Sequence, residues 1–118
     1  MSVIDYRDSR AIYEQIASHY ERLILRGVLQ EDEQMPSVRS LAMELSTNPN
    51  TVQKAYSRLE GDGFIYTIKG RGNFVCNADM LRERRREELA ERMRKLLVEA
   101  KEIGVDGGEL YDGAKKTL

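Results

Sequence analysis

Hydrophobic residues recur at helical spacing near the start of the chain. One stripe consists of Ile12, Ile16, Tyr20, Leu23 and Ile24. Such spacing predicts an amphipathic helix that begins near residue 9 or 10. Gly27 follows the stripe and is typical of a helix end. A short strand is expected at Val28 and Leu29, before the polar segment 31–34.

Two shorter amphipathic helices are predicted next, separated by a few residues. The first starts after Pro36, with Ser37 as its candidate N-cap, and its apolar stripe is Val38, Leu41, Ala42 and Leu45. The second covers about residues 48–60, with Asn48 as N-cap and Pro49 at the first helical position. Its buried stripe is Val52, Ala55, Tyr56 and Leu59, and its opposite face has polar side chains and cations but no carboxylate. Two such helices joined by a short turn predict a helix-turn-helix.

A β-hairpin is expected after the second of these helices. Residues 64–68 and 73–76 are rich in β-branched and aromatic side chains, which favours two short strands. The connecting residues 69–72, with two cations and two glycines, favour a tight turn. A helix-turn-helix followed by such a hairpin predicts a winged helix.

The last third of the chain predicts a long helix over residues 80–103 and a short one over 106–118. The long helix has an apolar seam at heptad spacing, formed by Leu89, Met93, Leu96, Ala100 and Ile103 and widened by Leu97. The seam indicates a partner helix. The alternative is that it packs on the N-terminal part of the same chain. The expected organisation is a winged-helix domain at 1–77 and a two-helix tail at 78–118.

Charge separates the middle of the chain from its two ends. The 118 residues have a net charge of −1, which does not point to a nucleic-acid partner. Residues 36–77, however, carry 5 basic and 3 acidic side chains, whereas residues 1–35 carry 4 and 7. The positive excess therefore lies in the segment with the predicted helix-turn-helix and hairpin, where a local face does the electrostatic work.

Several classes of function lack the residues they require. His19 is the only histidine and Cys76 the only cysteine, so no histidine metal cluster, Ser-His catalysis or internal disulfide is expected. We predict no enzyme activity, no metal and no cofactor. A single cysteine, no secretory signal and no long apolar run indicate a cytoplasmic protein. The basic run 84–86 is interleaved with glutamates, which favours a solvated helix face with i,i+4 ion pairs over a DNA contact.

Four ordered segments resemble the DNA-binding domain of GntR-family transcription regulators. They are PSVRSLA at 36–42, NPNTV at 48–52, LEGDGFI at 59–65 and GRGNFV at 70–75. IYEQI at 12–16 is similar to the first helix of the family. The sequence departs from the family pattern at Glu31 and Asp32, at Ala11 and at Asn73, which concern loop, cap and wing geometry.

The resemblance implies a set of DNA contacts. The matching positions are Arg39, Asn48, Asn50, Thr51 and Gln53 for the major groove and Gly70 for the minor groove. The side chains suit this, because Arg39 can bind a guanine edge or a phosphate and Asn50 or Gln53 can pair with adenine. Thr51 near a helix start suits a phosphate. Lys54 and Lys69 are expected to neutralise phosphates, and Arg71 suits a narrow minor groove.

The short tail indicates the YtrA-like subgroup, whose two-helix tail serves mainly for dimerisation. Two helices of this length are not expected to enclose a metabolite pocket of about 300 Å³ or more. The expected function is a homodimeric repressor of a palindromic operator in double-stranded DNA. The alternative is a winged-helix protein-interaction module without DNA binding. A small effector in a dimer cleft is compatible with the sequence, which identifies none.

Overall fold

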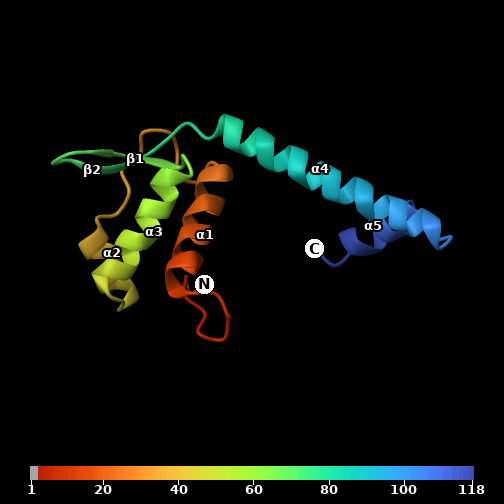
Figure 1. Ribbon diagram of the computed structural model, residues 1–118, viewed down its shortest axis with the longest axis horizontal. Coiled ribbons are helices and arrows are strands. Elements are labelled where there is room, and N and C mark those ends of the chain that lie inside the picture. The colour runs from red at the N-terminus through yellow and green to blue at the C-terminus, as the bar shows by residue number, and fades with distance from the viewer. Residues whose placement is uncertain (1–2) are drawn as a thin grey trace. The chain divides into compact units, whose positions relative to one another are not determined.

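The computed structural model describes residues 3–118, which form five helices and one two-stranded sheet (Figure 1). In chain order these are α1 (Ile12–Leu25), α2 (Val38–Leu45), α3 (Pro49–Gly61), β1 (Ile65–Ile68), β2 (Gly72–Val75), α4 (Asp79–Glu102) and α5 (Gly107–Lys115). The mainly helical winged helix-turn-helix with a hairpin wing and C-terminal helices confirms the predicted fold class. Residues 1 and 2 of the predicted DNA-binding domain lie outside the described residues.

The chain divides into two compact units. The first ends at Leu81, and the second is residues Arg82–Leu118. The first turn of α4 belongs to the first unit, because Ala78 is buried in its core and Leu81 packs against that core. The assignment of DNA binding to one part and dimerisation to the other stays a prediction.

The two helices of the helix-turn-helix begin where the sequence indicates. Ser37 is extended and its hydroxyl accepts a 3.0 Å hydrogen bond from the Ser40 N–H. The Asn48 side chain accepts a 2.8 Å hydrogen bond from the Asn50 N–H, and Pro49 is in the first turn. Both predicted N-caps are therefore confirmed. Each satisfies a backbone donor that has no partner inside the helix.

Two expectations about α1 are wrong. The helix begins at Ile12 rather than at residue 9 or 10, because Ala11 is in an extended conformation. Val28 and Leu29 form no strand, because their N–H groups both donate to the Leu23 carbonyl, at 2.9 and 3.2 Å. Together with the bond from Gly27 to the Ile24 carbonyl, at 3.1 Å, this closes the helix end as a Schellman motif.

The core of the first unit is centred on α3. Both α1 and α2 pack against α3, and in Figure 1 they flank it on opposite sides. The largest fully buried side chains of the unit are Ile16, Ile24, Leu41, Val52, Tyr56, Leu59, Ile65 and Val75. The predicted apolar stripe of α3 is thus buried, which leaves its polar face outward.

The hairpin of β1 and β2 extends on the α2 side of α3 (Figure 1). Its strands are antiparallel, with Ile65 opposite Val75 and Ile68 opposite Gly72, and each lies within one residue of its predicted bounds. A third segment, which the sequence did not indicate, runs along the other edge of β2. The N–H groups of Asp32 and Met35 donate to the carbonyls of Val75 and Asn73, both at 2.8 Å. In the other direction, the Val75 N–H donates to the Glu33 carbonyl at 2.9 Å. The wing therefore rests on a third segment at residues 32–35, in which Gln34 pairs with Phe74 and Asp32, at the start, has a φ of 66°.

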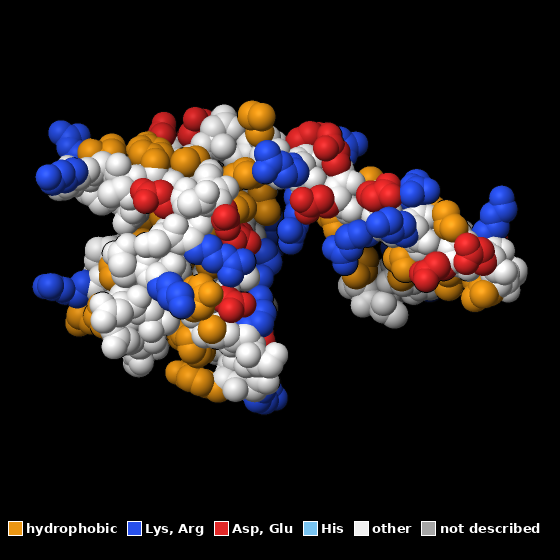
Figure 2. Space-filling view, in the orientation of Figure 1, with side chains coloured by type: hydrophobic (Ala, Val, Ile, Leu, Met, Phe, Trp, Pro, Cys, Tyr) orange, Lys and Arg blue, Asp and Glu red, His pale blue; other side chains and the backbone are white. Residues whose placement is uncertain are grey.

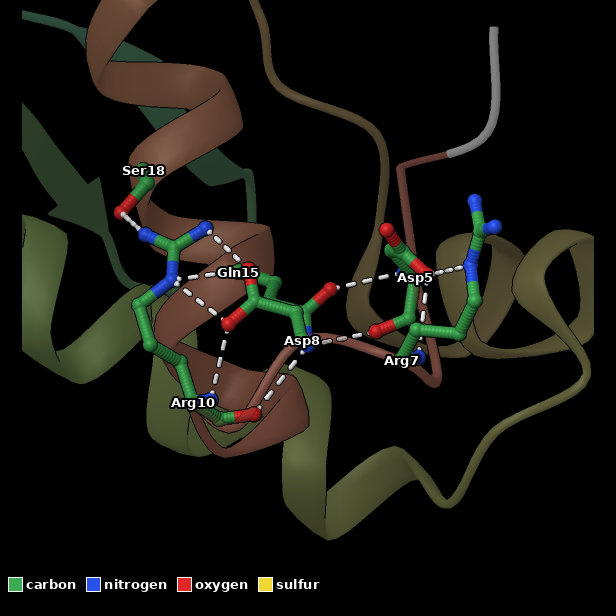
Figure 3. Close-up of polar contacts among 6 residues, drawn as sticks. All are labelled: Asp5, Arg7, Asp8, Arg10, Gln15 and Ser18. Atoms are coloured by element: carbon green, nitrogen blue, oxygen red, sulfur yellow. Dashed lines mark hydrogen bonds and ion pairs between the residues drawn. The ribbon is translucent and has the colours of Figure 1, made fainter.

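The segment before α1 is folded onto that helix (Figure 3). Gln15 is 3 % exposed and its amide is fully used: Oε1 accepts from the Asp5 N–H at 2.7 Å, and Nε2 donates to the carbonyls of Asp5 and Arg10, both at 3.1 Å. The Arg10 guanidinium contacts the Asp8 carboxylate at 2.9 Å and donates to the Ser18 hydroxyl at 3.2 Å. Asp8 consequently has a pKa below its usual range, because Arg10 donates hydrogen bonds to the carboxylate.

Candidate nucleic-acid interface

The start of α2 places Arg39 on the surface. Arg39 is exposed, two residues after the capping Ser37. Just before the cap, the Pro36 carbonyl accepts a 2.7 Å hydrogen bond from the Tyr56 hydroxyl of α3. Burial raises the pKa of Tyr56 well above its usual range, so the hydroxyl stays protonated and able to donate. Sequence reasoning assigned Tyr56 to the core and missed this bond to the residues that precede Arg39.

The first turns of α3 present the other predicted base-reading side chains. Asn50 and Gln53 are exposed, and Thr51 is half-buried next to the fully buried Val52. The Gln53 amide donates a 3.3 Å hydrogen bond to the Ser57 hydroxyl on the same face. Asn48 is exposed but has a structural task as well, since it caps the helix. This end of α3 thus combines side-chain amides with the positive end of the helix dipole.

Lys54 has a neighbour that the sequence did not indicate. Its Nζ lies 4.1 Å from the centre of the Tyr13 ring on α1, a cation–π distance. The Lys54 side chain remains exposed. Tyr13 therefore holds the ammonium close to the helix surface without neutralising its charge.

The tip of the hairpin is exposed and basic. Figure 2 shows Lys and Arg side chains at its free end, where the sequence has Lys69 and Arg71. Gly70, between them, has a φ of 80°, and the Arg71 N–H closes the turn on the Ile68 carbonyl at 2.9 Å. A turn of this kind favours glycine because other residues rarely adopt a positive φ.

The base of the hairpin is tied to its surroundings by side chains. The Tyr66 hydroxyl donates to the Asp32 carboxylate at 2.7 Å, and this bond raises the pKa of Tyr66. The Thr67 hydroxyl lies 2.6 Å from a carboxylate oxygen of Glu60 on α3 and 2.7 Å from the amide oxygen of Asn73 on β2. The wing is thus connected to α3 as well as to the 32–35 segment.

In the second unit, the predicted seam is only partly covered by its own chain. Leu89, Met93, Leu96, Leu97 and Ile103 are 51, 47, 59, 46 and 77 % exposed. Ala100 is 4 % exposed, since it is covered within the pair of helices. Leu97 packs against Gly107 of α5 so closely that a Cβ at Gly107 would displace it. Ala100 and Leu97 therefore contribute to the α4–α5 contact, while the other seam residues leave about half or more of their surface exposed.

An open apolar groove of about 480 Å³ runs between α4 and α5. Its lining combines seam residues with side chains of α5: Met93, Leu96, Leu97, Glu99, Ala100, Ile103, Gly107, Leu110, Tyr111 and Ala114. The sequence led us to expect that two helices would not enclose a metabolite pocket, and this space is an open groove rather than an enclosed pocket. It is open because only two helices line it.

The basic run at residues 84–86 forms ion pairs along α4. Arg85 contacts Glu88 at 3.8 Å and Arg86 contacts Glu83 at 3.7 Å. Both pairs have i,i+3 spacing, whereas i,i+4 pairs were expected. These exposed pairs contribute little to stability.

The described residues offer neither a metal site nor a membrane span. Within residues 3–118, no group of three or more His, Cys, Asp or Glu side chains is placed to hold a metal ion. No described helix has the length and apolar character needed to span a membrane.

Comparison with known proteins identifies the first unit. Residues 12–75 match the family model described as "Bacterial regulatory proteins, gntR family". The chain belongs to the GntR family. It is therefore a DNA-binding transcription regulator rather than an enzyme, as predicted.

Individual relatives extend the similarity to both units. The chain is 39 % identical over 118 residues to the HTH-type transcriptional repressor YtrA of Bacillus subtilis (strain 168), covering 98 % of this chain and 91 % of the relative. A GntR family transcriptional regulator from Listeria monocytogenes has a TM-score of 0.74 at 30 % identity, over 96 % of this chain and 98 % of that one. AraR(DBD), solved in complex with operator ORR3, has a TM-score of 0.52 at 26 % identity, over 54 % of this chain and 77 % of that one. The predicted similarity to YtrA-like regulators is confirmed.

Proposed function

We propose that the chain is a homodimeric repressor that binds a palindromic operator. In this proposal α3 enters the major groove with its first turn, and the hairpin tip reaches the adjacent minor groove. The α4–α5 tail joins two copies. The protein acts in the cytoplasm, where its DNA target lies.

One observation carries the DNA-binding part of this proposal. The first unit exposes Arg39, the first-turn amides of α3 and the basic hairpin tip together, while the apolar face of α3 is buried. Arg39 is suited to a guanine O6/N7 edge, and Asn50 or Gln53 to adenine N6/N7. Lys54, Lys69 and Arg71 supply positive charge for the backbone and minor groove. The operator complex of the similar AraR(DBD) supports this use of the fold.

The dimer rests on the seam of α4. Exposed leucine, methionine and isoleucine side chains repeat along one helix next to an apolar groove. Contiguous apolar surface of this kind marks an interaction site. A second copy is the simplest partner, because the same seam on both chains is self-complementary about a two-fold axis. Two recognition helices related by that axis read two half-sites about one helical turn apart.

Repression is proposed from the similarity to YtrA, which is named a repressor and which this chain matches over nearly its full length. In this proposal the bound dimer represses by covering a promoter.

Selection from a random duplex library tests the DNA-binding proposal directly. The full chain is expected to enrich a palindrome and to bind it about 10³-fold or more tightly than random DNA at physiological salt. Dimethyl sulfate protection would then show whether guanine N7 atoms in the major groove are covered. Recovery of no enriched sequence, even at low salt, would favour the protein-interaction alternative.

A further inference from the structure

The tip of the wing is held by a side chain from outside the hairpin. Gln34 lies on the 32–35 segment, paired with Phe74 of β2. Its Nε2 donates a 2.9 Å hydrogen bond to the carbonyl of Arg71, at the far end of the hairpin. The two residues are 37 positions apart in the chain. A non-local contact thus reaches the turn that carries the predicted minor-groove residues.

This bond holds a peptide group of the turn from outside the hairpin. The Arg71 N–H is held by the Ile68 carbonyl, and the Arg71 carbonyl is held by Gln34. Both sides of Arg71 are therefore anchored, which restricts the direction in which its side chain leaves the backbone. The Arg71 side chain itself is exposed.

Gly72 makes room for this arrangement. It has a φ of 117°, and a Cβ built at this position would lie 3.1 Å from the Gln34 Nε2. A larger residue would press the amide away from the Arg71 carbonyl. The glycine after Arg71 is therefore explained by the approach of Gln34 as well as by the backbone conformation.

The backbone of the 32–35 segment places Gln34 accurately. Hydrogen bonds from Asp32 to Val75 and from Met35 to Asn73, both 2.8 Å, bracket Gln34 along the edge of β2. Met35 is in addition buried in the core. Because the neighbouring Met35 is buried, the core as well as the hairpin fixes the backbone position from which the Gln34 side chain extends to the tip.

We infer that Gln34 is a positioning residue for DNA binding, which holds the Arg71 peptide so that the wing tip enters the minor groove in one orientation. Gln34 does not itself contact the DNA in this inference, and it acts through Arg71 and Gly70. The inference rests on the proposed function, because it assumes that the wing meets DNA. Pre-ordering of the tip lowers the entropic cost of binding.

The test uses the full chain with Gln34→Met, which keeps the length of the side chain and adds no charge but removes the donor. Gln30→Met is the matched control, because Gln30 is exposed near the start of the same loop and its side chain donates no hydrogen bond within residues 3–118. The probe is the duplex selected from a random library by the wild-type chain. Two footprints are compared: hydroxyl-radical cleavage, which reports on the minor groove, and dimethyl sulfate methylation, which reports on guanine N7 in the major groove.

Gln34→Met is expected to lose minor-groove protection at the flanks, to keep major-groove protection and to bind about fivefold more weakly, as for the loss of one neutral hydrogen bond. The amide NMR signals of Arg71 and Gly72 should also shift in the free protein. Gln30→Met should match the wild type in every measurement.

Two results overturn the inference, and a third separates it from the proposed function. Unchanged minor-groove protection in Gln34→Met contradicts a positioning role. Equal loss of protection in both grooves indicates a general structural defect instead. If the wild-type chain selects no duplex, the proposed function fails first and the inference fails with it.

Discussion

The hydroxyl of Tyr56 on α3 donates a 2.7 Å hydrogen bond to the carbonyl of Pro36, the residue that precedes the N-cap of α2. This bond joins the helix that would read the major groove to the start of the helix that carries Arg39. It therefore helps to hold the start of α2, which carries Arg39, against α3.

Tyr56→Phe is expected to lower the free energy of unfolding by about 1 kcal/mol, because the Pro36 carbonyl loses its donor while the ring still fills the core. Urea unfolding followed by circular dichroism measures the change. Tyr66→Phe is the matched control, since it removes an exposed hydroxyl that bonds to Asp32. A larger loss in Tyr66→Phe than in Tyr56→Phe would contradict the role given to the Pro36 bond.

Arg39→Ala is expected to weaken operator binding by about 1–3 kcal/mol and to relax base preference at one position of each half-site, because a base-edge contact is lost. Fluorescence anisotropy on the selected duplex and on single-base variants measures both effects. Arg26→Ala, an exposed arginine at the end of α1, serves as the control and should bind like the wild type. Equal weakening on selected and random DNA would remove the base-reading role of Arg39.

Lys54→Ala is expected to weaken binding to selected and random DNA alike and to lower the slope of log K against log salt by about one, as for one lost phosphate contact. Titrations at several salt concentrations measure the slope. The cation–π contact with Tyr13 gives Lys54 an alternative role, which is to pack against α1. If Lys54 serves only to pack against α1, Lys54→Ala would reduce stability and leave the slope unchanged.

Leu96→Asp is expected to convert the dimer into a monomer, because Leu96 is 59 % exposed in the single chain and a carboxylate would be buried in the proposed interface. Sedimentation velocity measures the oligomeric state. Binding to the full palindrome should fall by about 100-fold or more with little change on an isolated half-site, since avidity is lost.

Met80→Asp is the control for Leu96→Asp. Met80 is an apolar residue of α4 that is 81 % exposed and lies outside the seam. It should leave the dimer intact. A monomeric wild-type chain, or dissociation by both substitutions, would argue against the seam as the interface.

Local signals in the sequence predicted the helix-turn-helix well. The caps at Ser37 and Asn48 were found because a cap depends on residues two or three positions apart. The Val28–Leu29 strand was wrong because apolar pairs also occur where a helix end is closed by a Schellman motif. The α1 start was misplaced because no side chain caps it.

Contacts between distant parts of the chain were the ones missed. The 32–35 segment has no strand pattern of its own and is held by hydrogen bonds to β2, about 40 residues later. The Gln34–Arg71 and Tyr13–Lys54 contacts each join residues from different elements, and periodicity within one element carries no information about them. The candidate DNA contacts were predicted from family resemblance, whereas the side chains that support them could be identified only from the three-dimensional structure.

The buried amide of Gln15 has a practical consequence for anyone preparing a minimal DNA-binding fragment. The family match covers residues 12–75, yet Gln15 bonds to Asp5 and Arg10, and Ile4 is buried. A fragment cut at the limits of the match would leave the Gln15 amide without these partners, at a cost of about 1–3 kcal/mol. The cooperative folding unit is therefore wider than the region of family similarity, and fragment boundaries should be drawn outside Ile4 and Leu81.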